Sequence, residues 1–162
     1  MPTTGPIDPL MGIEGQPPAA GGAVGPSDTQ AAMVRALSSR DAAPSCADLD
    51  AQTADPVADY RWIVEHVAMP PTAGIRAAEC LVVGHATAAA DLMRRWVSEP
   101  QLKGFGWVAL RHLDRVEPTL ARELATLALT AGPDPAGAAK RIRALESAEL
   151  RALADDPDLQ PR

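Results

Sequence analysis

The sequence predicts an all-helical protein in which about six short helices stack as antiparallel pairs behind a disordered N-terminal arm. Near residue 55 the composition changes from Pro, Gly, Ala, Ser and Asp to a chain with regular apolar spacing. Apolar residues then recur every three or four positions, which is the period of an amphipathic helix. Several segments open with an acid that can cap a helix and a proline that suits its first position. These pairs are Asp55-Pro56, Glu99-Pro100, Glu117-Pro118 and Asp134-Pro135.

Residues 1–45 form the predicted arm. Residues 1–26 are rich in Pro and Gly and hold too little apolar surface to offset the entropy of ordering, which predicts disorder. Residues 28–38 have helical spacing, with Ser27 or Asp28 as the N-cap. Only Met33, Val34 and Leu37 are available to dock this segment, so we expect a loosely held helix.

The predicted domain spans residues 46–154 and begins with one helix pair. The first helix follows Asp55, carries Tyr60 and Ile63 on its apolar stripe, and ends at 69–71. The second helix follows Thr72 and has two stripes, one apolar and one made of small side chains that include Cys80. Two buried faces predict a helix packed between neighbours.

Four further helices are expected. The third opens at Thr87, and the fourth opens at Pro100 or near Gly106, because glycines weaken its first turns. The fifth runs from Pro118 to Gly132, and the sixth follows Pro135 and bends near Ser147, with residues 155–162 as a frayed tail. The apolar stripes place three leucines in the core, namely Leu81, Leu113 and Leu124.

The odd-numbered helices start near residues 56, 88 and 118, a step of about 31 residues that is typical of a helical repeat. In the second helix, residues 74–81 read Gly-Ile-Arg-Ala-Ala-Glu-Cys-Leu. Here the chain resembles the HEAT-type repeats, especially the short bacterial form, by spacing over 55–145 and by motif in one unit. The resemblance implies a right-handed α-solenoid that serves as a protein-binding scaffold or adaptor. A non-repetitive helical bundle is the alternative fold. The alternative function is an accessory subunit or a helical-repeat enzyme, lyase-like or nucleic-acid-repair-like.

Composition and charge bear on the class of partner. The net charge is −6, and both the arm and the helical part are acidic, which argues against a nucleic-acid partner. No apolar run reaches the length of a membrane span, so we expect no membrane insertion. The sequence contains no recognisable catalytic, cofactor-binding or metal-ligand motif. We therefore expect a non-catalytic protein without cofactor or metal, whose partner is another protein. The Arg-rich, Lys-poor composition is typical of GC-rich bacterial coding.

Cys46 and Cys80 leave two interpretations open. In a reducing compartment they are two small apolar residues, and in an oxidising one they form the single intrachain bridge. Such a bridge would tie the end of the arm to the first helix pair. No signal peptide is visible, so the default location is cytoplasmic, whereas a bridged pair would indicate a periplasmic or exported protein.

Two aromatic residues stand off their apolar stripes. Trp62 shares a helix face with His66, and Trp107 shares one with Arg111. An aromatic ring beside a polar side chain at a partly exposed position is typical of an interface anchor. We therefore expect these four residues to contribute to partner binding. The alternative is that neighbouring helices cover both tryptophans. In that case the His66 side chain only interacts favourably with the terminal carbonyl groups of its helix.

Overall fold

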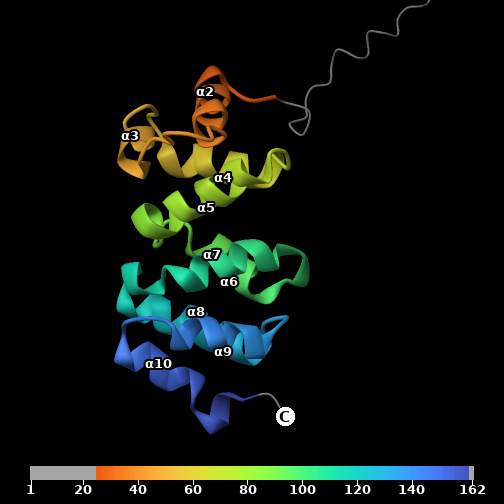
Figure 1. The fold of residues 1–162 in the computed structure, drawn as a ribbon, viewed down its shortest axis with the longest axis vertical. Coiled ribbons are helices and arrows are strands. Elements are labelled where there is room, and N and C mark those ends of the chain that lie inside the picture. The colour runs from red at the N-terminus through yellow and green to blue at the C-terminus, as the bar shows by residue number, and fades with distance from the viewer. Residues whose placement is uncertain (1–24, 161–162) are drawn as a thin grey trace, which may run out of the picture.

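The computed structural model describes residues 25–160, and all regular secondary structure in that range is helical (Figure 1). Nine α-helices occur in the described residues. They are α2 (Asp28–Leu37), α3 (Cys46–Asp50), α4 (Pro56–His66), α5 (Pro71–His85), α6 (Ala90–Ser98), α7 (Lys103–Arg111), α8 (Pro118–Ala131), α9 (Pro135–Arg143) and α10 (Ala148–Ala154). Short 3₁₀ turns lie at Pro100–Leu102, Leu113–Arg115 and Pro157–Leu159.

The helices from α4 onward pack in two rows. Consecutive helices contact each other as α4 with α5, α6 with α7, and α8 with α9. In one row α6 contacts α8 and α8 contacts α10, and in the other α5 contacts α7 and α7 contacts α9. Figure 1 shows the result as an elongated stack with α2 and α3 at one end and α10 at the other.

The acid–proline pairs act as predicted at three of four helix starts. The side chains of Asp55, Glu117 and Asp134 accept backbone N–H groups in the first turns of α4, α8 and α9. These bonds satisfy donors that a helix start otherwise leaves without a partner. Glu99-Pro100 instead precedes only a 3₁₀ turn, and α7 begins at Lys103, between the two predicted starts.

One apolar core runs through the stack. Leu81, Leu113 and Leu124 are each at most 1 % exposed, which confirms their predicted burial. The core extends from Met33 to Ala154, and no polar or charged residue is buried within the described part of the chain. Small side chains contribute many of the buried positions, so the helices approach each other closely.

The N-terminal boundary differs from the one predicted. Residues 28–37 form a packed helix with a capping box between Ser27 and Gln30, and Met33 and Leu37 are buried. The reason lies on α5, where the Arg76 guanidinium donates to the carbonyl oxygens of Leu37 and Ser39, 2.7 and 2.8 Å away. The helical packing therefore extends to residue 27, N-terminal to the predicted start at 46. The disorder predicted for residues 1–26 falls almost wholly on residues 1–24, which lie outside the described residues.

The described residues contain three α-helices more than the predicted six. α2 was expected to be loose, and α3, capped by Ser45, was not predicted. At the predicted bend Ser147 caps a separate helix, α10, because its hydroxyl oxygen accepts the Leu150 N–H. The expected frayed tail also differs, since Pro157–Leu159 forms a turn that contacts α8.

Candidate functional site

Trp62 and His66 form a stacked pair on α4. Their ring centroids lie 4.7 Å apart with planes 15° from parallel, and His66 Nδ1 lies 2.9 Å from the Trp62 carbonyl oxygen. Trp62 is half-buried and His66 is exposed, so the pair faces solvent on one edge. The structure therefore brings together the first pair of predicted binding residues.

Trp107 and Arg111 do not form the second pair. The Arg141 guanidinium of α9 lies over the Trp107 ring, 3.8 Å from its centroid, and Lys103 approaches it at 5.8 Å. Arg111 turns instead to Glu79 on α5, at 3.4 Å. The alternative in which a neighbouring helix covers the tryptophan therefore describes Trp107. The first two residues lie on α4 and the other two on α7, helices that make few or no contacts with each other, so the four predicted residues do not form a single site.

A series of ion pairs, which we call the Arg ladder, runs along the row of α6, α8 and α10 and extends it to α4. Arg61 of α4 donates from both terminal nitrogens to the Asp91 carboxylate of α6, each at 2.9 Å. Two further rungs follow down the row, Arg94 with Glu123 and Arg122 with Glu149. The three rungs join residues that are 30, 29 and 27 positions apart.

Two carboxylates of the Arg ladder have pKa values below their ordinary range. Hydrogen bonds from Arg61 lower the pKa of Asp91 to about 2, and those from Arg94 lower the pKa of Glu123. The sequence analysis did not identify this ladder. The available signal was an Arg followed by an acid about 30 residues later, as at Arg61, Arg94 and Arg122.

Two open hollows lie on the outer face of this row. The first is on α4 and is lined by Asp55, Val57, Ala58, Arg61, Trp62 and Glu65. The second is on α8 and is lined by Thr119, Arg122, Glu123, Thr126, Leu127 and Thr130. Four positions of one correspond to four of the other at an offset of 61 residues, for example Ala58 with Thr119 and Arg61 with Arg122. Both hollows are walled by side chains of the Arg ladder.

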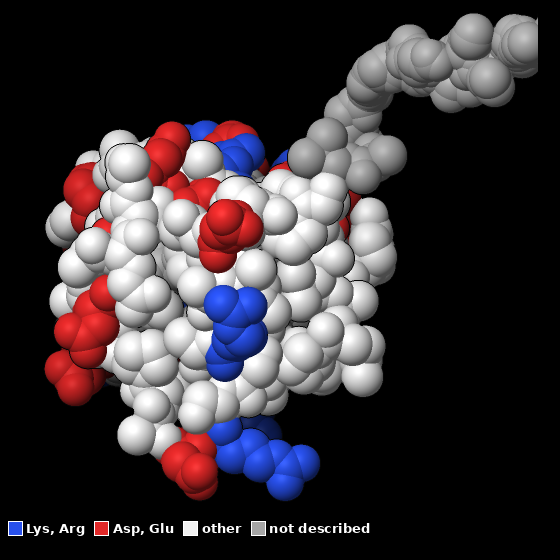
Figure 2. All heavy atoms as spheres, turned by 90° about the horizontal axis from the view of Figure 1, so that it is seen from above, with Lys and Arg blue, Asp and Glu red and all other residues white. Residues whose placement is uncertain are grey.

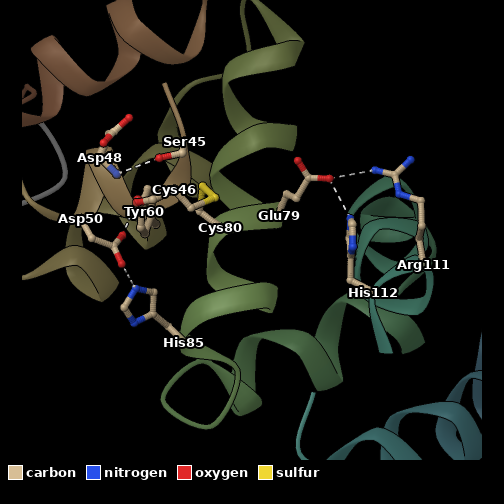
Figure 3. Close-up of a disulfide and its surroundings, with 10 residues drawn as sticks. All are labelled: Ser45, Cys46, Asp48, Asp50, Tyr60, Glu79, Cys80, His85, Arg111 and His112. Carbon is tan, nitrogen blue, oxygen red and sulfur yellow. Dashed lines mark hydrogen bonds and ion pairs between the residues drawn. A yellow bond between two sulfur atoms is a disulfide. The ribbon is translucent and has the colours of Figure 1, made fainter. Parts of the chain in front are cut away.

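The two cysteines are bonded in the structure (Figure 3). Cys46 begins α3 and Cys80 lies on α5, with their Cα atoms 5.3 Å apart across 34 residues of chain. This separation lies within the range that a disulfide requires. The bond joins the segment before α4 to the first helix pair, as in the bridged interpretation of the sequence.

A polar cluster lies beside the disulfide. The Asp50 carboxylate accepts the Tyr60 hydroxyl at 2.6 Å and lies 2.9 Å from His85 Nε2 (Figure 3). Burial, together with the neighbouring Asp50, raises the pKa of Tyr60. The Tyr60 hydroxyl also lies 3.4 Å from the Cys46 carbonyl oxygen. Asp50 therefore ties α3 to both α4 and the end of α5.

Four arginines of α6, α7 and the turn after α7 are largely neutralised by acidic partners. Of Arg94, Arg95, Arg111 and Arg115, the first three make ion pairs with glutamates, and only Arg115 makes none with the described residues. Figure 2 views the α2–α3 end of the stack, where most of the surface is uncharged and the charged side chains are scattered. Neither the surface around these four arginines nor the α2–α3 end of the stack forms a continuous basic patch of the kind that binds nucleic-acid phosphates.

Residues 25–160 contain no group of three or more His, Cys, Asp or Glu side chains placed to hold a metal ion. None of the helices in this range has the length and apolar character needed to cross a membrane. In comparisons with known proteins, the chain matches no family model, no curated protein and no solved structure.

Proposed function

We propose that this chain is a protein-binding scaffold of the HEAT-like helical-repeat kind. In this proposal the partner is another protein, and it binds the outer face of the row formed by α4, α6, α8 and α10. The role is non-catalytic: the face positions a partner and transforms no substrate.

The Arg ladder is the observation that carries the proposal. Each rung joins residues 27–30 positions apart on two helices of one row, which is the contact pattern expected when similar units stack. The offset of 61 residues between the two hollows is close to twice the step of about 31 residues read from the sequence. The two hollows therefore present an arginine at equivalent points, Arg61 and Arg122, two steps apart along one face.

The composition of this face suits a protein partner. Half-buried Trp62 and Leu127 offer apolar surface beside paired Arg and acidic groups, a mixture common at the edges of protein interfaces. The stacked Trp62 and His66 rings form a rigid aromatic anchor, and aromatic anchors contribute disproportionately to binding energy. Because the Arg groups are already paired, the face carries little free positive charge for a polyanion.

The test uses matched charge insertions on exposed positions. Ala58→Arg and Thr119→Arg place the same side chain at equivalent points of the two hollows, and Ala136→Arg places it on α9 in the other row. Proteins that bind the wild type should be captured from the source cells, purified, and titrated against each variant. We expect each hollow variant to weaken binding at least tenfold and Ala136→Arg to leave it within twofold.

Equal binding by all three variants would exclude this face as the binding surface. A captured nucleic acid whose affinity falls steeply with salt would instead favour the repair-like alternative. Circular dichroism of each variant separates lost binding from lost folding.

A further inference from the structure

We infer that the Cys46–Cys80 disulfide is a redox-controlled latch that holds an N-terminal cap on the helical stack. The cap consists of α2, α3 and their connection, residues 27–50. Its packing is confined to one end of the stack, because α2 contacts α4 and α5 and makes no comparable contact with α6 to α10. In a stacked array such local contacts allow one end to open while the rest stays folded.

Apart from the disulfide, the cap has few anchors. Its buried apolar side chains are Met33, Leu37 and Leu49. Its polar anchors to the stack are the Arg76 bonds to the end of α2, a Gln30–Asp59 bond of 3.0 Å, and the bonds of Asp50 to Tyr60 and His85. The disulfide is the one covalent cross-link between the cap and the helices that it covers.

α3 is the part of the cap that depends most on this bond. It has five residues, and only Leu49 among them is buried. A helix of that length does not persist by itself, because its nucleation cost exceeds the gain from so few backbone bonds. Cleavage leaves α3 attached through Leu49, the bonds of Asp50 and the contact of the Tyr60 hydroxyl with the Cys46 carbonyl oxygen. We therefore expect α3 to be released first, and the connection between α2 and α3 then loses its fixed end.

A thiol reductant can reach the disulfide on the Cys46 side. Cys80 is 3 % exposed, whereas Cys46 is partly exposed, so an incoming thiolate reaches Cys46 Sγ first. Attack there forms a mixed disulfide and releases the Cys80 thiolate, which takes up a proton. The second thiol of a dithiol reductant then closes its own ring disulfide and frees the Cys46 thiol. Two electrons and two protons thereby pass from the dithiol to the cysteine pair.

Hydrogen exchange of the full chain with and without dithiothreitol tests the latch. On reduction we expect protection of amides in residues 31–37 and 48–50 to fall at least tenfold. Amides in α6, α7, α8 and α9 should stay within twofold. A uniform loss of protection would make the disulfide a global brace, and unchanged protection everywhere would show that the cap does not need it. Either result overturns the latch.

Two variants make the test independent of the reductant. Cys46→Ala/Cys80→Ala should show the loosened cap in both conditions and no response to dithiothreitol. Asp50→Asn removes the carboxylate charge beside Tyr60 and His85, so it should change little while the bond is intact and add to the loss of protection once it is reduced. The latch is also wrong if the double variant protects α2 and α3 as well as the oxidised wild type does.

Discussion

At the scale of single residues, Gly106 sets how closely α7 approaches α6. A Cβ atom at this position would lie 2.5 Å from the Trp96 carbonyl oxygen, closer than packed atoms allow. Nothing lies within 4 Å of a Cβ atom built on Gly104, two residues earlier in the same helix. The two glycines that weaken the helix start in the sequence therefore have different roles, and only Gly106 is required by packing.

This contrast predicts opposite effects for the same substitution. Gly106→Ala should destabilise the protein by about 1–3 kcal/mol, because α6 and α7 must move apart. Gly104→Ala should stabilise it by up to about 1 kcal/mol through helix propensity. Urea denaturation of both variants measures the difference, and equal effects would mean that the close approach of the two helices is wrong.

Leucine burial on α8 provides a second prediction at this scale. Leu124 is fully buried, whereas Leu127, one turn further on, is half-buried in the outer hollow. Leu124→Ala should cost about 2–5 kcal/mol of unfolding free energy, because it leaves a cavity in the core. Leu127→Ala should cost clearly less, and chemical denaturation compares the two. A larger loss at Leu127 would reverse the assignment of the two faces of α8.

At the scale of elements, the rows are joined by apolar packing inside and by ion pairs at the surface. Packing supplies most of the stability, since exposed ion pairs contribute little each. The ladder rungs instead fix the relative position of the two helices that each joins. A bidentate pair such as Arg61 with Asp91 can form only when its two helices lie in one relative position. This is a physical reason for a rung at every step of the row.

The first rung predicts a specific pH dependence. The folded pKa of Asp91, about 2, lies below its ordinary value, so its stabilising contribution is complete above about pH 4 and is lost as pH falls toward 2. Asp91→Asn should lower unfolding free energy at pH 7 by less than about 1 kcal/mol, because the Asp91 side chain is 63 % exposed.

The difference between wild type and Asp91→Asn should shrink between pH 4 and pH 2. Denaturation midpoints across this range measure it, and Asp158→Asn in the C-terminal turn serves as the control. A difference that stays constant down to pH 2 would contradict the lowered pKa of Asp91.

At the scale of the whole molecule, the stack is a linear assembly whose ends are not alike. The N-terminal end is covered by α2 and by the cross-linked α3, while the C-terminal end is closed by α10 and the turn at 157–159. The stability of a shortened chain should therefore depend on which end is removed. Removal of α2 is an informative test, because α2 packs against the rest of the stack.

Limited proteolysis of the oxidised protein should leave a resistant fragment that begins near residue 25. Met33 and Leu37 each contribute about 1.5–3 kcal/mol through burial, so a chain that starts at residue 45 should unfold at lower denaturant concentration. Mass spectrometry identifies the fragment, and denaturation compares it with the shortened chain. A resistant core that starts beyond residue 40 would contradict the packing of α2, and one that retains residue 10 would contradict the disorder predicted for residues 1–26.

The sequence by itself determined the features that depend on near neighbours. The all-helical class, the buried leucines and the capping acids at residues 55, 117 and 134 follow from interactions within one or two turns. Only the tertiary structure decided the features that join distant segments. Arg76 holds α2 in place from 37 and 39 positions away, and Arg141 rather than Arg111 covers Trp107. Such pairings depend on which helices become neighbours, and that is a property of the packed stack and not of any single helix.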